Sequence, residues 1–258
     1  MPEGDTIHYA ANRIRPLLEG RVPAEIVTPQ PRHAMDRWPQ RLRARAVRSV
    51  DAHGKHLFLR FEGDLTMHSH LRMTGAWAVY ERGRRWGRSP RRAWLIVRTP
   101  SHDVVQFDGP VFELMTESRT RFEQRLSALG PDVLGEQLDA AALLRRLRAD
   151  DPTRPLGDAL LDQRTIAGIG NLWKAEACWD AGIDPWRALQ EVDDAEVLAV
   201  VEAARARMGS AALRGHRDRD HRVYGRAGLP CRRCGGRIRA RGQGDDDRRT
   251  YWCPACQR

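Results

Sequence analysis

Four cysteines near the end of the chain have the spacing of a metal site. Cys231 and Cys234 form one Cys-x-x-Cys pair, and after 18 intervening residues Cys253 and Cys256 form a second. Four thiolates in this pattern suit a tetrahedral Zn²⁺, and the segment between the pairs is typical of a β-hairpin. Because all four ligands are cysteine, no coordination position is open for catalysis. We therefore expect one structural zinc ion in a zinc ribbon.

The N-terminus, MPEGD, offers a different chemistry. Removal of Met1 would leave Pro2 with a free secondary amine, next to the carboxylate of Glu3. An α-amine has a pKa of roughly 7.7, against about 10.4 for lysine, so far more of it is uncharged at neutral pH. Such an amine can attack an aldehyde-like carbon and form a Schiff base. The alternative is an N-terminal tail without a role.

Only two residues of the chain are lysine, Lys55 and Lys174. Lys55 follows Gly54 at the start of a predicted strand and shares the inward parity of Leu57, so it either lines a cleft or reaches past the strand end to water. Lys174 lies in the first turn of a predicted helix. Helical periodicity favours a solvent-facing phosphate contact there, with a nucleophilic amine as the alternative.

A glycine-rich turn precedes the helix that carries Lys174. Gly168, Gly170 and Asn171 lie within GIGN, where backbone N–H groups at a helix start can hold a phosphate. An ordinary turn between helices is the alternative. His68 and His70 share one face of a predicted strand, but no third metal ligand is evident beside them.

Composition points to a polyanionic partner. The 258 residues are 41% hydrophobic with a net charge of +10, and the stretch from Arg214 to Arg258 holds 13 arginines against five aspartates. Nucleic acid fits this charge better than a membrane, because no strongly amphipathic basic helix accompanies it. With no apolar run of about 20 residues and no signal-like N-terminus, we expect a cytoplasmic monomer, associated with the nucleoid when it binds DNA.

The elements that must position these residues suggest an α+β fold. A helix after Asp5 ends near Gly20, antiparallel strands follow to about Leu114, and helical spacing begins near residues 115–135. From about residue 216 the pattern returns to short strands and turns. We expect an N-terminal helix with an antiparallel β-sandwich over 1–120, a helical domain over 121–215, and a zinc-ribbon module over 216–258.

Four stretches together resemble the formamidopyrimidine-DNA glycosylase/endonuclease VIII family of base-excision repair enzymes. They are PEGDTIHYA, GKHLF, LGDALLDQRTIAGIGNLWKAEACWDAGIDP and YGRAGLPCRRCG…RRTYWCPACQ, in this order along the chain. The start PEGDT is similar to the endonuclease VIII branch.

The resemblance implies a role for each matching residue. Pro2 would attack C1′ of a damaged nucleotide, Glu3 would act as general acid and proton shuttle, and Lys55 would contact a phosphate and assist catalysis. Asn171, with the turn at Gly170, would belong to a helix–two-turns–helix motif that grips the DNA backbone.

The resemblance also implies contacts at the lesion. Arg248 would hold a phosphate there, with Arg249 as the alternative one position on, although the run Asp245–Asp247 beside them should repel DNA. Met73 would fill the space left by the extruded base, unless it is a core residue of a strand.

These expectations describe a bifunctional DNA glycosylase/AP lyase that binds damaged DNA. The stretch FDGPVFEL lacks the Arg-Phe pair of the formamidopyrimidine branch, which favours oxidised pyrimidines or abasic sites as substrates. Two alternatives remain: a damage-binding protein on the same scaffold without efficient chemistry, and an unrelated zinc-ribbon nucleic-acid factor.

Overall fold

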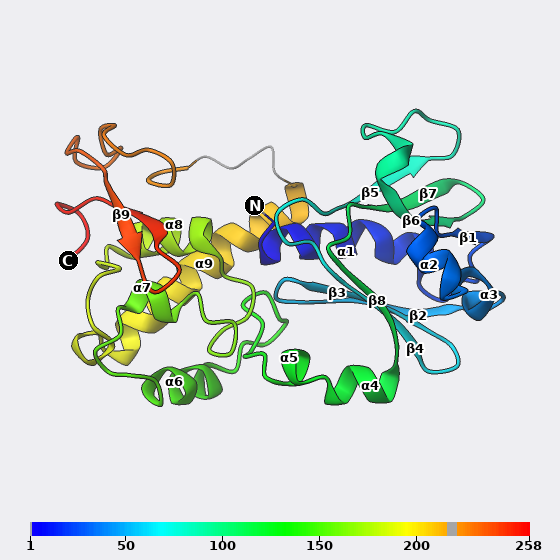
Figure 1. Cartoon of the computed structure of the whole chain (residues 1–258). Coiled ribbons are helices and arrows are strands. Elements are labelled where there is room, and N and C mark those ends of the chain that lie inside the picture. The colour runs from blue at the N-terminus through cyan, green and yellow to red at the C-terminus, as the bar shows by residue number, and fades with distance from the viewer. Residues whose placement is uncertain (1, 216–220) are drawn as a thin grey trace. The chain divides into compact units, whose positions relative to one another are not determined.

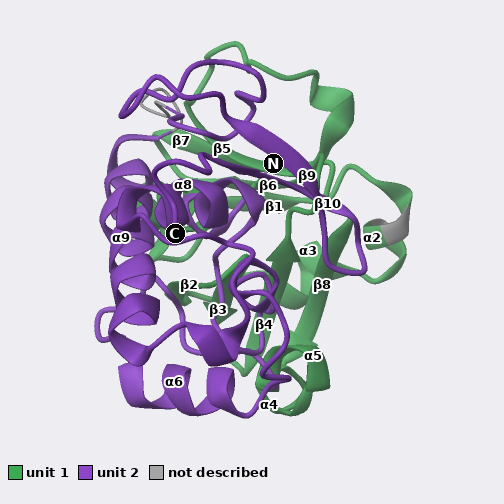
Figure 2. Cartoon of the chain, turned by 90° about the vertical axis from the view of Figure 1, so that its left-hand side faces the viewer, with its two compact units in different colours: residues 1–2, 6–127 green, residues 3–5, 128–258 purple. Residues whose placement is uncertain are grey.

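The computed structural model describes residues 2–215 and 221–258, which fall into two compact units (Figure 1; Figure 2). Unit 1 contains Pro2 and Thr6–Ser127, and unit 2 contains Glu3–Asp5 and Ala128–Arg258. Removal of Met1 and the predicted boundary at residue 216 both lie outside the described residues. The division into three domains stays a prediction.

Unit 1 is built from two four-stranded antiparallel sheets. The strand order is β2-β3-β4-β8 in one sheet and β1-β6-β7-β5 in the other. The first sheet comprises β2 (Val47–His53), β3 (His56–Phe61), β4 (Leu65–His70) and β8 (Val111–Thr116); the second comprises β1 (Glu25–Val27), β5 (Ala76–Glu81), β6 (Ala93–Arg98) and β7 (His102–Phe107). Its helices are α1 (Gly4–Leu18), α2 (Pro31–Met35), α3 (Trp38–Leu42), η1 (Pro90–Arg92), α4 (Glu117–Phe122) and α5 (Gln124–Ser127).

One apolar core joins α1 to both sheets of unit 1. Ile14 of α1, Leu59 of β3 and Val97 of β6 are fully buried in it. Burial of such side chains is worth roughly 1.5–3 kcal/mol each, which is why the alternating strands stack as a sandwich. The short helices α2 and α3 were not predicted within the extended region, although Pro31 and Pro39 suit the first turn of a helix.

Unit 2 is mainly helical and ends in a β-hairpin. Its elements are α6 (Ala140–Arg148), α7 (Leu156–Ala159), α8 (Asn171–Ala181), η2 (Leu189–Glu191), α9 (Asp194–Arg214), β9 (Arg239–Gln243) and β10 (Arg248–Trp252). Asp193 caps α9 by accepting a hydrogen bond from the Glu196 N–H at 2.8 Å. Residues Asn171–Trp179 of α8 are all buried, so this helix is the centre of the unit.

A second core holds the helices of unit 2 together, and a third joins α8 to the hairpin. Ala175 and Trp179 of α8 pack there against Ile238 and two of the four cysteines. The α+β prediction, with an N-terminal helix, antiparallel sheets, a helical part and a C-terminal cysteine cluster, is confirmed. Among the described residues no helix combines the length and the apolar character needed to cross a membrane.

Candidate active site

Glu3 is fixed at the N-terminus of α8, within unit 2. Its carboxylate is buried and accepts hydrogen bonds from the N–H groups of Gly170 at 3.0 Å, Leu172 at 2.9 Å and Trp173 at 3.3 Å. The first N–H groups of a helix lack partners within the helix, and the helix dipole favours an anion there. The backbone therefore holds Glu3 as a carboxylate in one position.

The glycine at position 170 is required by this arrangement. A Cβ atom at Gly170 would lie 2.3 Å from the carboxyl carbon of Glu3, so any side chain would displace it. The Gly4 N–H also donates to the Gly168 carbonyl at 3.0 Å. The turn was predicted to hold a DNA phosphate, and this needs correction: the Gly170 N–H is donated to Glu3.

Pro2, the predicted nucleophile, precedes Glu3 directly and is partly exposed. Position 3 is anchored by three hydrogen bonds, and a single peptide bond joins the two residues. The nitrogen that the mechanism needs is therefore attached to one of the most constrained carboxylates of the chain.

Lys55 lies in the turn between β2 and β3 of unit 1 and is partly exposed. Leu57 and Leu59 do face the core, but Lys55 itself precedes the strand. It is close enough to His56 and His70 to lower the pKa of both rings, after the larger effect of burial. The pKa falls to about 2 for His56 and about 4 for His70, so both are neutral at pH 7.

These histidines connect the Lys55 turn to a second turn that follows β4. His70 Nδ1 accepts a hydrogen bond from the Arg72 N–H at 3.1 Å, and His56 Nδ1 lies 2.8 Å from His68 Nε2. The sequence marked His68 and His70 only as a weak metal pair. Among the described residues, the cysteines form the one cluster with metal-ligand geometry. The histidines instead shape the surface around Lys55.

Met73 projects from this second turn and is 65% exposed. It does not belong to a strand and does not reach the core, so the alternative of a core methionine is wrong. A large exposed apolar side chain in a turn of a basic protein is available to contact a ligand.

The hairpin of unit 2 carries the predicted phosphate contacts. Arg248 forms an ion pair with Asp246 at 2.7 Å, whereas Arg249 is exposed and has no ion-pair partner among the described residues. Asn171 Nδ2 donates to the Arg249 carbonyl at 2.9 Å, while its buried Oδ1 has no hydrogen-bond partner. The residues Asn171 and Arg249 are thus brought together, and the acidic run occupies Arg248.

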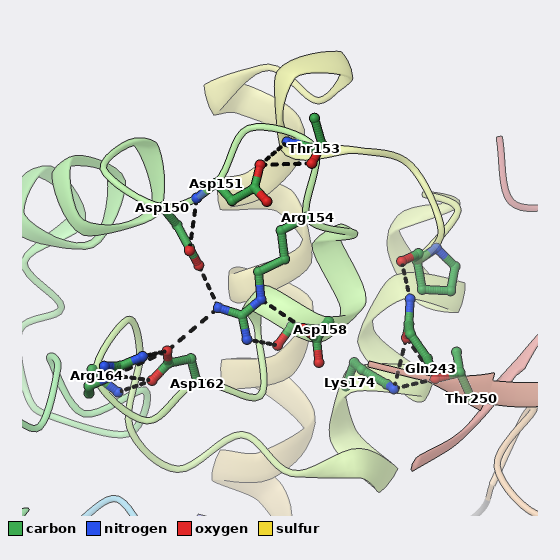
Figure 3. A network of polar contacts seen from close by, with 11 residues as sticks. Asp150, Asp151, Thr153, Arg154, Asp158, Asp162, Arg164, Lys174, Gln243 and Thr250 are labelled. Atoms are coloured by element: carbon green, nitrogen blue, oxygen red, sulfur yellow. Dashed lines mark hydrogen bonds and ion pairs between the residues drawn. The ribbon is translucent and has the colours of Figure 1, made fainter. Parts of the chain in front are cut away.

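Lys174 is completely buried, so its predicted exposure to solvent is wrong. Its Nζ donates to Gln243 Oε1 at 3.2 Å and to Thr250 Oγ1, both from the hairpin (Figure 3). Burial lowers its pKa to about 8. Periodicity fails here because α8 is covered on every side. In this position the ammonium group is not available to a DNA phosphate.

The same hairpin is tied to the body of unit 2 by two further contacts. Gln243 Nε2 donates to the Pro185 carbonyl at 2.8 Å, and a Cβ atom at Gly244 would lie 2.3 Å from Asp158 Oδ1. Asp158 in turn pairs with Arg154 at 2.7 Å, within the network of Figure 3. A polar residue of inward parity in a short strand, Gln243, was the signal that sequence reasoning missed.

The four predicted zinc ligands lie together. The sulfur atoms of Cys231, Cys234, Cys253 and Cys256 are all within 4.8 Å of one another. Backbone N–H groups point at two of them, from Arg233 to Cys231 and from Gly236 to Cys234, each at 3.4 Å. Such donors stabilise thiolates, so the donor set fits a tetrahedral zinc ion.

Comparison with known proteins agrees with this arrangement. The formamidopyrimidine-DNA glycosylase N-terminal domain matches residues 1–124, the H2TH domain of that glycosylase matches 129–219, and the zinc finger found in FPG and IleRS matches 228–258.

Two curated relatives match the whole chain. The probable endonuclease 8 2 of Streptomyces coelicolor is 44% identical over 100% of this chain and 94% of its own. The DNA-(apurinic or apyrimidinic site) lyase Nei2 of Mycolicibacterium smegmatis is 36% identical over 100% and 99%. Among solved structures, the Lactococcus lactis Fpg (MutM) in complex with DNA containing N7-benzyl-Fapy-dG has a TM-score of 0.81 at 21% identity, with all of both chains covered, which shows a shared fold. The chain belongs to the formamidopyrimidine-DNA glycosylase/endonuclease VIII family of DNA repair enzymes.

Proposed function

We propose that this chain is a bifunctional DNA glycosylase/AP lyase that works through a Schiff base on Pro2. The observation that carries the proposal is the anchored carboxylate of Glu3, directly after the nucleophile. The Pro2 nitrogen would attack C1′, and the base would leave with the bonding electrons of the glycosidic bond and take up a proton. Opening of the sugar ring would then yield an iminium ion between Pro2 and C1′.

Glu3 would stabilise the positive charge that develops at C1′ and at the iminium nitrogen. It would also act as general acid on the deoxyribose and carry protons during elimination of the 3′-phosphate. Water would finally hydrolyse the iminium and regenerate the Pro2 amine. Lys174 is a poor candidate for the nucleophile, because its amine is buried and donates to Gln243 and Thr250.

The DNA contacts of the proposal come from both units. Lys55 would contact a phosphate beside the lesion, and Met73 would enter the stack that the extruded base leaves. Arg249 is preferred over Arg248 as the lesion-phosphate contact, since Asp246 already neutralises Arg248. Asn171 would support it through the Arg249 carbonyl.

Oxidised pyrimidines and abasic sites are the proposed substrates. The chain lacks the Arg-Phe pair in FDGPVFEL, and a relative of the same length is named an apurinic or apyrimidinic site lyase. The four cysteines would hold one structural zinc ion that fixes the hairpin bearing Arg249. A monomer is the proposed form.

Borohydride trapping on an abasic-site oligonucleotide, followed by peptide mapping, tests the mechanism. We expect a covalent adduct on Pro2, and we expect Pro2→Ala to lower the lyase rate by about 10²-fold or more while abasic-DNA affinity is unchanged. An adduct on Lys174 would overturn the mechanism. Salt-sensitive binding without any adduct would leave a damage-binding protein instead.

A further inference from the structure

A strongly basic loop joins β5 to β6 in unit 1, and the proposed chemistry does not use it. Residues 82–92 contain no acidic residue and six arginines: Arg82, Arg84, Arg85, Arg88, Arg91 and Arg92. Residues 84–90 line a groove of about 640 Å³. So many cations in one loop create a strong positive potential that favours a polyanion.

The loop has a built shape. Trp86 stacks on Tyr80 of β5 with ring centroids 5.9 Å apart, and the Gly87 N–H donates to the Tyr80 hydroxyl at 3.2 Å. Arg88 and Arg92 both pair with Asp108, at 3.3 and 2.5 Å. Because Trp86 is already stacked, the loop is suited to contact a backbone and not to stack on bases.

Two arginines of the loop are left over. Arg85 and Arg91 are exposed, and the described part of the chain offers neither of their side chains an acidic partner. Their planar guanidinium groups can each bind a phosphate through two hydrogen bonds.

The loop is also tied to the turn that carries Met73. Arg88 Nη1 donates to the Thr74 carbonyl at 3.3 Å, one residue after Met73. If Met73 enters the base stack, the loop lies beside the same duplex. We propose that the 82–92 loop is a second phosphate-binding element, with Arg85 and Arg91 contacting the DNA backbone beyond the lesion. This inference rests on the proposed function for the place of Met73.

The salt dependence of binding tests the loop. The probe is a duplex of about three helical turns with a tetrahydrofuran abasic analogue. We compare the wild type, Arg85→Ala/Arg91→Ala, and a control, Arg21→Ala/Arg43→Ala, which removes two exposed charges from the same unit. Each lost phosphate contact lowers the slope of log K against log salt by about 0.9. We expect a decrease of about 2 for the loop variant and little change for the control.

The chemistry must stay intact for the interpretation to hold. At saturating DNA, we expect the loop variant to trap at Pro2 at the wild-type rate within about twofold, since its arginines bind and do not react. Equal slopes for the loop variant and the control would overturn the proposal, and so would a large loss of rate at saturation. Failure of the wild type to trap would refute the Schiff-base chemistry, while the slopes would still decide the role of the loop.

Discussion

The two lysines of the chain have opposite surroundings, and the contrast separates residues that act on a ligand from residues that hold the fold. Lys55 lies in a partly exposed turn of unit 1, beside neutral histidines. Lys174 is fully buried in unit 2 and bound to neutral groups of the hairpin. A buried ammonium group loses its hydration and has no acidic partner among these contacts to compensate. Lys174 therefore contributes to stability through packing and hydrogen bonds, at an electrostatic cost that Lys55 does not bear.

Truncation of the buried lysine should have the largest effect on stability. Lys174→Ala leaves a cavity between α8 and the hairpin and removes two hydrogen bonds, so we expect a loss of about 4 kcal/mol in the free energy of unfolding, measured by urea denaturation. Lys174→Met fills the same volume without the charge and leaves the Thr250–Gln243 hydrogen bond at 2.7 Å. It should cost less than about 1.5 kcal/mol. Similar values for the two variants would show that packing at this position does not matter.

The lowered pKa of Lys174 predicts a dependence of stability on pH. Its pKa is about 8 in the folded chain, against 10.5 as the ordinary value. Between these pH values the unfolded chain holds the proton that the folded chain has released, so stability rises with pH. The full difference corresponds to about 3 kcal/mol.

The matched measurement is the free energy of unfolding of the wild type minus that of Lys174→Met, followed from pH 7 to pH 10.5. We expect this difference to move in favour of the wild type as pH rises, because only the wild type carries the penalised charge. Lys55→Met should leave the trend of the wild type unchanged. A flat difference would mean that Lys174 keeps its proton, or loses it equally in both states.

The comparison also shows what the sequence could and could not predict. The cysteine cluster and the strands were predictable, since close spacing and alternation are local properties of the chain. The partner of Glu3 was not, because it lies 167 residues away at Gly170. Likewise, the burial of Lys174 depends on a hairpin that follows it by about 70 residues. Local periodicity reports which face of a helix is apolar, but it does not report that a helix is covered on all sides.

Removal of the exposed lysine should affect the reaction and not the fold. We expect Lys55→Ala to lower the single-turnover rate of borohydride trapping by about 10²-fold, through loss of a positive charge at the lesion phosphate. Its melting temperature should stay that of the wild type, since a partly exposed turn residue has little packing to lose. Lys55→Arg keeps the charge and should recover part of the rate. A slower reaction that appears only together with a lower melting temperature would place Lys55 in the same class as Lys174. An unchanged rate with Lys55→Ala would remove it from the active site.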